Sequence, residues 1–324
     1  MVCELAESIK NYSVFVLVHG SEPDTEFAVS AHKRLNIKYL GINGKINIKS
    51  FFRVMKAFNA IKPDIVHCHL GVTYLGYLWC LVHRKKCVVT VHTRPEKAFS
   101  AKNCKAVKHG LKSGNIDLVA VSRENQRLCN EYFKTDKVKC VNNGVDLARF
   151  YRKNHDVYTF INVARQDENK NQGLILRCFA RLTAEGFMTK LYLLGDGSLH
   201  EELKETAKTL HIEKQVVFTG NVSDVENYYA ISDCFLLSSH REALPMTAIE
   251  AAAAGLTIIS TDVGGMKDIV RENGMLIKDG DEDGFYSAMK DAITQRRNDR
   301  ERSVNIAREY SSEKMAERYE AIYE

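Results

Sequence analysis

Residues 159–186 read TFINVARQDENKNQGLILRCFARLTAEG and contain the unit that decides the fold. Thr159–Ala164 is a short run rich in β-branched and apolar residues, which is typical of a buried strand. After a polar loop, apolar side chains recur at helical spacing from Leu174 to Leu182, and Gly186 is a typical end for a helix. This stretch therefore predicts a strand, a loop and a helix in that order.

The same alternation extends over the whole chain. Further strand-like runs, most of them separated by stretches long enough for a helix, are Ser13–Val18, Ile37–Leu40, Ile65–His69, Cys87–Val91, Asp117–Val121, Val138–Val141, Leu191–Leu194, Val216–Thr219, Cys234–Leu237, Thr257–Ser260 and Met275–Ile277. Strands that alternate with helices form parallel sheets covered by helices on both faces. Because 324 residues suffice for two domains of about 150 residues each, we predict an α/β protein with two Rossmann-like domains. Ligands are expected at the carboxyl ends of the strands.

The best candidate for a domain boundary is Asn142–Asp146, because Asn and Gly tolerate positive φ and can turn the chain sharply. An ordinary turn inside one domain is the alternative. We expect an N-terminal domain over residues 1–146 and a C-terminal domain over 147–324, whose last helix, Glu313–Tyr323, is a candidate to cross back. The chain opens directly in an amphipathic helix, Val2–Ile9, so the strand that normally begins a Rossmann domain has no residues to form it.

Composition excludes several classes of protein. With 45% hydrophobic and 27% charged residues, the chain is neither disordered nor collagen-like, and no apolar run approaches the roughly 20 residues of a membrane span. Nine scattered cysteines without a C-x-x-C pair predict free thiols and a cytosolic protein. Residues 1–150 carry 24 Lys and Arg against 12 Asp and Glu, whereas the remainder is acidic. The basic half could bind an anionic membrane, a phosphorylated acceptor or nucleic acid, or its charge could simply keep the domain soluble.

Two carboxylates flank the start of a predicted helix in the second half. Glu242 lies in a loop just ahead of Pro245, a residue suited to a first helical turn, and Glu250 lies five residues after it, about 7.5 Å along the axis. Free N–H groups at a helix start attract a phosphate. The pair could hold hydroxyl groups on either side of a diphosphate, as in a nucleotide sugar; alternatively, Glu250 is a surface residue of an Ala-rich helix.

The surrounding motifs carry a resemblance. In order along the chain they are a strand with Arg165 and Lys170, Leu194-Gly195-Asp196-Gly197, Phe218-Thr219-Gly220, the E-x7-E of Glu242 and Glu250, and Val263-Gly264-Gly265. Together they resemble the family 4 retaining glycosyltransferases, which have the GT-B fold of two Rossmann-like domains facing each other across a cleft. The resemblance covers the chain from its first helix to its last, without the family's usual first strand and Gly-rich loop.

The resemblance implies roles for individual residues. Glu242 matches the glutamate near the donor hexose, Glu250 the one that binds ribose hydroxyls, and Arg165 with Lys170 the pair that neutralises the donor diphosphate. Solvated charges at a helix start are the alternative for that pair. Further donor-binding positions implied are Gly195, Gly220, Val222, Ala243, Leu244, Pro245 and Met246. Ala243 replaces the family's usual glycine, and its β-carbon narrows access to the donor. The resemblance therefore does not specify which sugar the donor carries.

Histidines are the candidate site residues of the first half. Thr90-Val91-His92-Thr93 resembles the strand end that carries the family's active-site histidine, so His92 is expected beside the leaving phosphate; an interdomain hydrogen-bonding histidine is the alternative. His67 and His69 share one face of a strand, but a third ligand at metal spacing is absent, which favours packed histidines over a zinc site. Asp279-Gly280-Asp281 is interpreted as a solvated loop. The resemblance implies no cofactor and no metal in catalysis.

Four lysines, Lys102, Lys105, Lys108 and Lys112, recur at helical spacing in the basic half. Such a stripe suits docking to an anionic membrane, with an ordinary solvated helix face as the alternative.

The expected function is retaining, metal-independent transfer of a hexose or N-acetylhexosamine from a UDP-linked sugar to a growing, lipid-linked glycan, as in capsule or exopolysaccharide biosynthesis. Expected partners are the nucleotide-sugar donor, a glycan or lipid-linked acceptor and an anionic membrane surface, but no nucleic acid. The expected location is cytoplasmic, peripheral on the inner face of the cell membrane. Two alternatives stay open: a nucleotide-sugar epimerase, and a catalytically silent partner subunit that binds nucleotide sugars.

Overall fold

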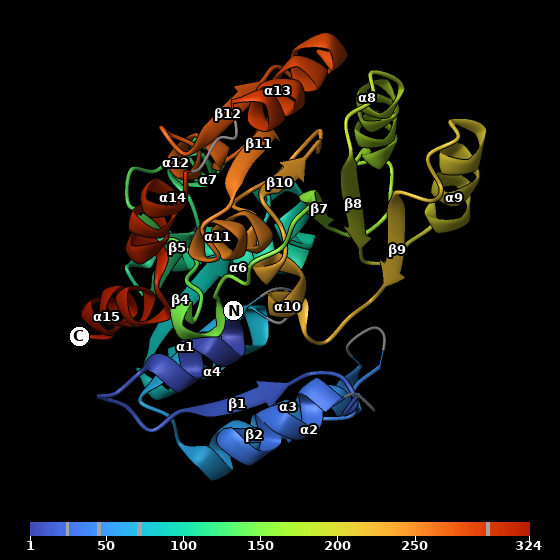
Figure 1. The fold of residues 1–324 in the computed structure, drawn as a ribbon. Coiled ribbons are helices and arrows are strands. Elements are labelled where there is room, and N and C mark those ends of the chain that lie inside the picture. Colours follow the sequence, from blue (N-terminus) through green and yellow to red (C-terminus); the bar gives the residue numbers. More distant parts are fainter. Residues whose placement is uncertain (24–25, 44–46, 70–72, 296–298) are drawn as a thin grey trace. The chain divides into compact units, whose positions relative to one another are not determined.

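The computed structural model describes residues 1–324 except 24–25, 44–46, 70–72 and 296–298. The chain divides into two compact units (Figure 1). The first unit joins Met1–Gly144 to Ser312–Glu324, and the second is Val145–Ser311. Each unit combines helices with parallel strands, so the predicted α/β class is confirmed.

The second unit contains one parallel sheet of six strands in the order β12-β11-β10-β7-β8-β9. Its strands are β7 (Tyr158–Val163), β8 (Thr189–Leu194), β9 (Val216–Gly220), β10 (Cys234–Leu237), β11 (Thr257–Thr261) and β12 (Gly274–Ile277). Its helices are η2 (Leu147–Arg149), α8 (Gln172–Ala184), α9 (His200–Thr209), α10 (Val225–Ala230), α11 (Met246–Ala253), α12 (Met266–Ile269), α13 (Glu282–Thr294), α14 (Arg300–Ala307) and η3 (Arg308–Tyr310). Helix α8 packs against α9 and α13, and α11 packs against α14. Parallel strands bring the loops after β7 and β10 to the same edge of this sheet.

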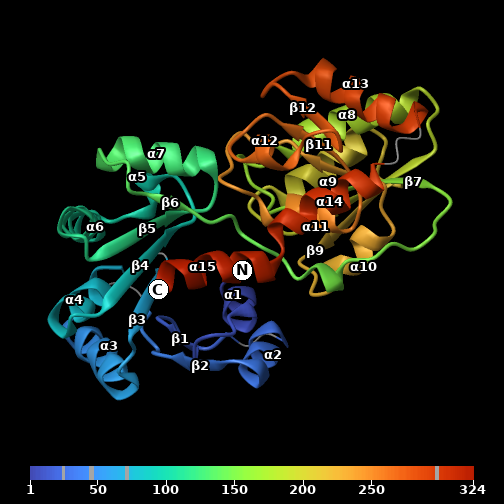
Figure 2. The ribbon, with the colours of Figure 1, turned by 90° about the vertical axis from the view of Figure 1, so that its left-hand side faces the viewer.

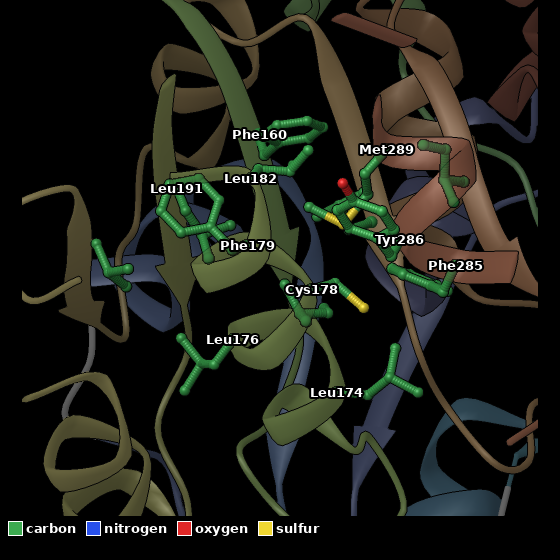
Figure 3. Close-up of a cluster of buried hydrophobic side chains, with 14 of the residues drawn as sticks. Phe160, Leu174, Leu176, Cys178, Phe179, Leu182, Leu191, Phe285, Tyr286 and Met289 are labelled. Atoms are coloured by element: carbon green, nitrogen blue, oxygen red, sulfur yellow. The ribbon is translucent and has the colours of Figure 1, made fainter. Parts of the chain in front are cut away.

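The core of the second unit confirms the helical spacing predicted for residues 174–182. Figure 3 shows the α8 side chains Leu174, Cys178 and Phe179 turned toward neighbouring apolar side chains. All five predicted core residues of this helix are buried: Leu174, Ile175, Cys178, Phe179 and Leu182. The helix ends two residues before Gly186, which adopts a φ of 86°. Burial of this apolar stripe stabilises the helix. Because the helix is held in place, the loop between β7 and α8 is held as well.

The first unit has two parallel sheets among its described residues. The smaller pairs β1 (Phe15–Val18) with β2 (Asn36–Tyr39), and the larger has the order β3-β4-β5-β6. The larger sheet consists of β3 (Ile65–His69), β4 (Lys86–Val91), β5 (Ile116–Ala120) and β6 (Lys139–Cys140). The helices are α1 (Val2–Ser8), α2 (Glu26–Arg34), α3 (Ile48–Ile61), α4 (Thr73–His83), α5 (Pro95–Ala98), α6 (Ala101–Ser113), α7 (Arg123–Phe133) and α15 (Ser312–Tyr323).

The two units differ in how their strands pair. In the second unit, β7 pairs with both β8 and β10. In the described part of the first unit, β1 pairs only with β2, and β3 only with β4. The described residues of the first unit therefore contain no strand that joins its two sheets.

The last helix, α15, belongs to the first unit. Tyr319 and Met315 of α15 pack in one buried cluster with Leu5 of α1 and with Val88 and Val119 of the sheet. Figure 2 shows α15 beside α1. The chain therefore leaves the first unit after Gly144 and returns to it at Ser312.

All nine cysteines are free thiols, as their spacing predicted. None of the helices described is both long and apolar enough to cross a membrane.

Candidate functional site

The central feature of the second unit is an ion pair between Lys170 and Glu242. Lys170 lies in the loop after β7, and Glu242 lies in the loop after the neighbouring strand β10. Lys170 Nζ donates a hydrogen bond to Glu242 Oε1 at 2.5 Å. The two side chains are 21% and 11% exposed, so the pair is partly shielded from water and still reachable by a ligand. The structure thus brings together two of the predicted site residues.

Hydrogen bonds to backbone groups hold the two loops against each other. The Asn169 carbonyl accepts from the backbone N–H of His240 at 2.8 Å, and the Asn169 amide donates to the Arg241 carbonyl at 3.0 Å. Ser238 donates its hydroxyl to the carbonyl oxygen of Lys170. These bonds involve neighbours of both charged residues. The Lys170–Glu242 geometry is therefore fixed by hydrogen bonds to the backbone as well as by the attraction between the two side chains.

The loop after β11 approaches Glu242 from another direction. Gly264 has a φ of 55°, and a Cβ at this position would lie 2.1 Å from the Glu242 carbonyl oxygen. The N–H of Gly265 donates to the Ala243 carbonyl at 2.8 Å. A side chain at position 264 would therefore displace the backbone that carries Glu242.

Arg165, predicted to act beside Lys170, has a different partner. Its side chain is 76% exposed and is paired with Asp167 at 2.6 Å. Asp167 also accepts from the backbone N–H of Lys170 at 3.2 Å. The two cations thus share one loop and one organising carboxylate, although they do not form a single cluster. Asp167 was not among the predicted site residues, although an acidic residue between two predicted phosphate-binding cations could have indicated it.

Gly195 brings the loop after β8 close to this first loop. Its φ is 110°, and a Cβ there would lie 2.2 Å from the Ala164 carbonyl oxygen. The Gln166 amide donates to the Gly195 carbonyl at 2.9 Å, and its Oε1 lies 2.7 Å from Nδ1 of His200. Gly195 also donates its N–H to the carbonyl of Gly220 at 2.8 Å. Gln166 and His200 were not predicted, because the contact between them depends on how two loops meet.

Glu250 lies on helix α11, as predicted, and occupies its fifth position. The buried hydroxyl of Tyr229 donates to Glu250 Oε2 at 3.2 Å and lies 3.0 Å from the Thr247 carbonyl. Pro245 is the residue just before the helix rather than its first member. The remaining predicted donor residues divide by burial: Leu244 and Pro245 are buried, and Ala243, Met246, Gly220 and Val222 are half-buried.

The interpretation of Asp279 and Asp281 as solvated loop residues is confirmed, since both are exposed, and each also has a hydrogen-bond partner. Asp279 lies 2.9 Å from Nδ1 of His240, and Asp281 caps α13 by accepting from the Gly284 N–H at 2.9 Å. Both carboxylates thus organise loops. No group of three or more His, Cys, Asp or Glu side chains in the described ranges is arranged to hold a metal ion.

In the first unit, the predicted histidines form one packed group. His92 directly follows β4, and its Nε2 lies 2.9 Å from Nδ1 of His69 at the end of β3. The rings of His67 and His69 are 4.1 Å apart, which confirms that they share a face of the strand. Burial lowers the pKa of His92 to about 4 and that of His67 to about 3, and it also lowers the pKa of His69. All three rings are therefore neutral at pH 7.

The four predicted lysines lie on helix α6, which confirms the helical prediction. Lys102, Lys105, Lys108 and Lys112 are exposed, whereas Val107 and Leu111 on the other face are buried. Lys102 Nζ lies 6.0 Å from the Tyr74 ring, and Lys108 Nζ lies 5.7 Å from the Tyr132 ring.

Comparisons with known proteins cover both units. The family described as "Glycosyl transferases group 1" matches residues 146–310, and "Glycosyltransferase Family 4" matches residues 1–149. An uncharacterized glycosyltransferase, MJ1059 of Methanocaldococcus jannaschii, is 28% identical over 242 residues, which are 66% of this chain and 59% of the relative. The chain thus spans about three fifths of the length of that relative.

A second relative is the UDP-Gal:alpha-D-GlcNAc-diphosphoundecaprenol alpha-1,3-galactosyltransferase of Escherichia coli, which is 27% identical over 75% of this chain and 70% of its own. The crystal structure of Anabaena HepE in complex with UDP matches 99% of this chain and 94% of that chain, with a TM-score of 0.81 and 15% identity. This likeness confirms the predicted fold class of two Rossmann-like domains of the GT-B type.

Proposed function

Because this chain belongs to the family of group 1 and family 4 glycosyltransferases, we propose that it is a retaining glycosyltransferase that uses a UDP-linked hexose or N-acetylhexosamine. The observation that carries this proposal is the Lys170–Glu242 pair at the carboxyl ends of two adjacent parallel strands. That edge is where α/β sheets bind ligands.

Lys170 and Arg165 are the proposed partners of the donor diphosphate. Each is now paired with a carboxylate, Glu242 and Asp167 respectively. On donor binding, the diphosphate replaces these carboxylates as the partner of the cations. Glu242 is then free to accept a hydrogen bond from a sugar hydroxyl. Two cations near the departing phosphate stabilise the negative charge that it gains in the transition state.

The proposed reaction needs no covalent intermediate on the protein and no divalent metal. The bond between the anomeric carbon and the diphosphate oxygen breaks, and a bond from that carbon to the acceptor oxygen forms on the same face of the sugar. The acceptor hydroxyl proton moves to the departing phosphate, so charge and atoms balance. The role proposed for His92 is that of a neutral ring that donates or accepts a hydrogen bond during transfer.

The nucleoside binds along α11 and the loop after β9. The carboxylate of Glu250, held by the Tyr229 hydroxyl, is the proposed partner of the ribose hydroxyls. The base lies next to Val222 and Gly220, where nothing lies within 4 Å of an added Cβ. UDP is the favoured nucleotide because HepE was solved with UDP and the E. coli relative is described as using UDP-Gal.

The proposed acceptor is a lipid-linked glycan, as in the description of the same E. coli relative. The exposed lysines of α6 dock the protein on the anionic inner face of the cell membrane, where such an acceptor resides. Capsule or exopolysaccharide assembly is the pathway class that fits this chemistry.

A transfer assay tests the proposal. The protein is incubated with a panel of UDP-sugars, with and without a polyprenyl-diphosphate-linked N-acetylhexosamine, and the products are followed by NMR. UDP release that requires the acceptor, with the donor's anomeric configuration retained in the product, supports the proposal. Epimerised sugar without an acceptor, or UDP binding without any transfer, contradicts it and favours an epimerase or a silent partner subunit.

A further inference from the structure

We propose that His69 is a positioning residue that fixes the ring orientation and tautomer of His92, and that helix α15 supports it through His67. The contribution of this arrangement to catalysis rests on the proposed function. The arrangement itself rests on contacts within the first unit.

The contact between His69 and His92 couples their protons. His69 Nδ1 and His92 Nε2 are 2.9 Å apart, and the planes of the two rings are inclined by only 23°. Burial keeps both rings neutral, so each has one N–H and one acceptor nitrogen. A hydrogen bond between His69 Nδ1 and His92 Nε2 requires that one of these two nitrogens carries a proton and the other does not. The pair is therefore either Nδ1–H on both rings or Nε2–H on both rings, and the proton on His69 determines the proton on His92.

His67 holds His69 from the other side. The ring centroids of His67 and His69 are 4.1 Å apart. Both nitrogens of His67 are engaged, since Nδ1 lies 2.7 Å from the Tyr323 hydroxyl and Nε2 lies 2.7 Å from Thr90 Oγ1. With both ends of the ring held, His67 cannot turn, and it forms a fixed wall for His69.

The support of His67 comes from the opposite end of the sequence. Tyr323 and Tyr319 belong to α15 and are buried, and the Tyr319 hydroxyl lies 2.8 Å from Thr90 Oγ1. The Tyr319 ring also lies 4.9 Å from the ring of His67. Two tyrosines of the last helix thus hold His67, which packs on His69, and His69 bonds to His92. This chain of contacts gives α15 a role at the site in addition to its packing.

Two substitutions of His69 test the proposal. His69→Leu removes the polar partner of His92, whereas His69→Asn places an amide close to the position of Nδ1. The readouts are ¹⁵N NMR of the His92 ring, and kcat and KM for transfer. We expect one dominant His92 tautomer in the unaltered protein, exchange between tautomers in His69→Leu, and recovery of one tautomer in His69→Asn. We also expect kcat to fall at least tenfold in His69→Leu with less than a threefold change in KM, and to recover in part in His69→Asn.

The role of α15 is tested by Tyr323→Phe, which removes one hydroxyl and keeps the ring. The matched control is Tyr77→Phe, because Tyr77 also bonds to a histidine of this unit, with its hydroxyl 2.6 Å from His109 Nδ1. Broadened His92 signals and a lower kcat in Tyr323→Phe, with neither in the control, support the proposal.

An unchanged His92 tautomer in His69→Leu overturns the proposal, as does equal kcat in both His69 variants and the unaltered protein. A protein without transferase activity contradicts the proposed function and leaves the tautomer readout intact, so the two failures are distinguishable.

Discussion

Glu242 Oε1 accepts a hydrogen bond from Lys170 Nζ at 2.5 Å, although 72 positions separate the two residues in the chain. Adjacent parallel strands bring the two loops together. The Asn169 carbonyl, which accepts from the His240 N–H, and the Asn169 side-chain amide, which donates to the Arg241 carbonyl, keep them there. The pair marks the place where we expect the donor diphosphate to replace a carboxylate as the partner of Lys170.

Lys170→Ala is expected to lower turnover by more than a hundredfold while the fold is kept, because loss of one such electrostatic donor typically raises the barrier by about 3–4 kcal/mol. The measurement is kcat for transfer, with circular dichroism as the check on folding. Lys267→Ala is the matched control, since Lys267 forms a comparable ion pair with Asp262 at 3.1 Å but is 70% exposed. Near-normal turnover of Lys170→Ala would count against the assignment.

Gly264→Ala is expected to destabilise the second unit by about 1–3 kcal/mol and to weaken donor binding. The new Cβ would meet the Glu242 carbonyl oxygen, and the φ of 55° disfavours any side chain. Gly186→Ala separates the two effects, because Gly186 also has a positive φ but nothing lies within 4 Å of the added Cβ. Thermal unfolding without UDP measures stability, and the shift on adding UDP measures donor binding. Equal changes of both quantities in the two variants would show that the close approach to Glu242 is unimportant.

Replacement of Lys105, Lys108 and Lys112 by Gln is expected to weaken binding to vesicles that contain anionic lipid by about a hundredfold, since each lysine near such a surface contributes about 1 kcal/mol. Flotation with anionic and with neutral vesicles is the measurement. Substitution of Lys204, Lys208 and Lys214 in the second unit is the control and should leave binding unchanged. Equal binding of the unaltered protein to both kinds of vesicle would refute the docking proposal.

The unfolding free energy of the first unit is expected to fall as the pH drops from 6.5 toward 4. Burial lowers the pKa of His92 to about 4 in the folded state, so between these pH values the unfolded chain binds more protons than the folded one. His92 alone contributes a loss of about 3 kcal/mol over this range. Denaturant unfolding at several pH values should therefore give a weaker pH dependence for His92→Asn than for the unaltered protein, and an identical dependence in both would contradict this account.

Much of the fold was predictable because it depends on local patterns. The spacing of Leu174, Cys178 and Leu182 predicted the buried face of α8, and the alternation of strands and helices predicted the parallel sheets. The position of Gly186 indicated the end of that helix to within two residues.

The partners of the candidate site residues were less predictable, because they come from distant parts of the chain. Asp167 pairs with Arg165, Tyr229 holds Glu250, and Tyr323 reaches His67 from a position 256 residues away. No spacing rule encodes such contacts, since they depend on how loops and helices meet in three dimensions. The contact between the exposed carboxylate of Asp279 and His240 has the same origin.

A crystal structure of the protein soaked with UDP tests the central claim most directly. We expect the diphosphate to lie within hydrogen-bond distance of Lys170 Nζ and Arg165, near the start of α11, with the Lys170–Glu242 contact broken. A diphosphate bound elsewhere, or these two side chains pointing away from it, would contradict the account.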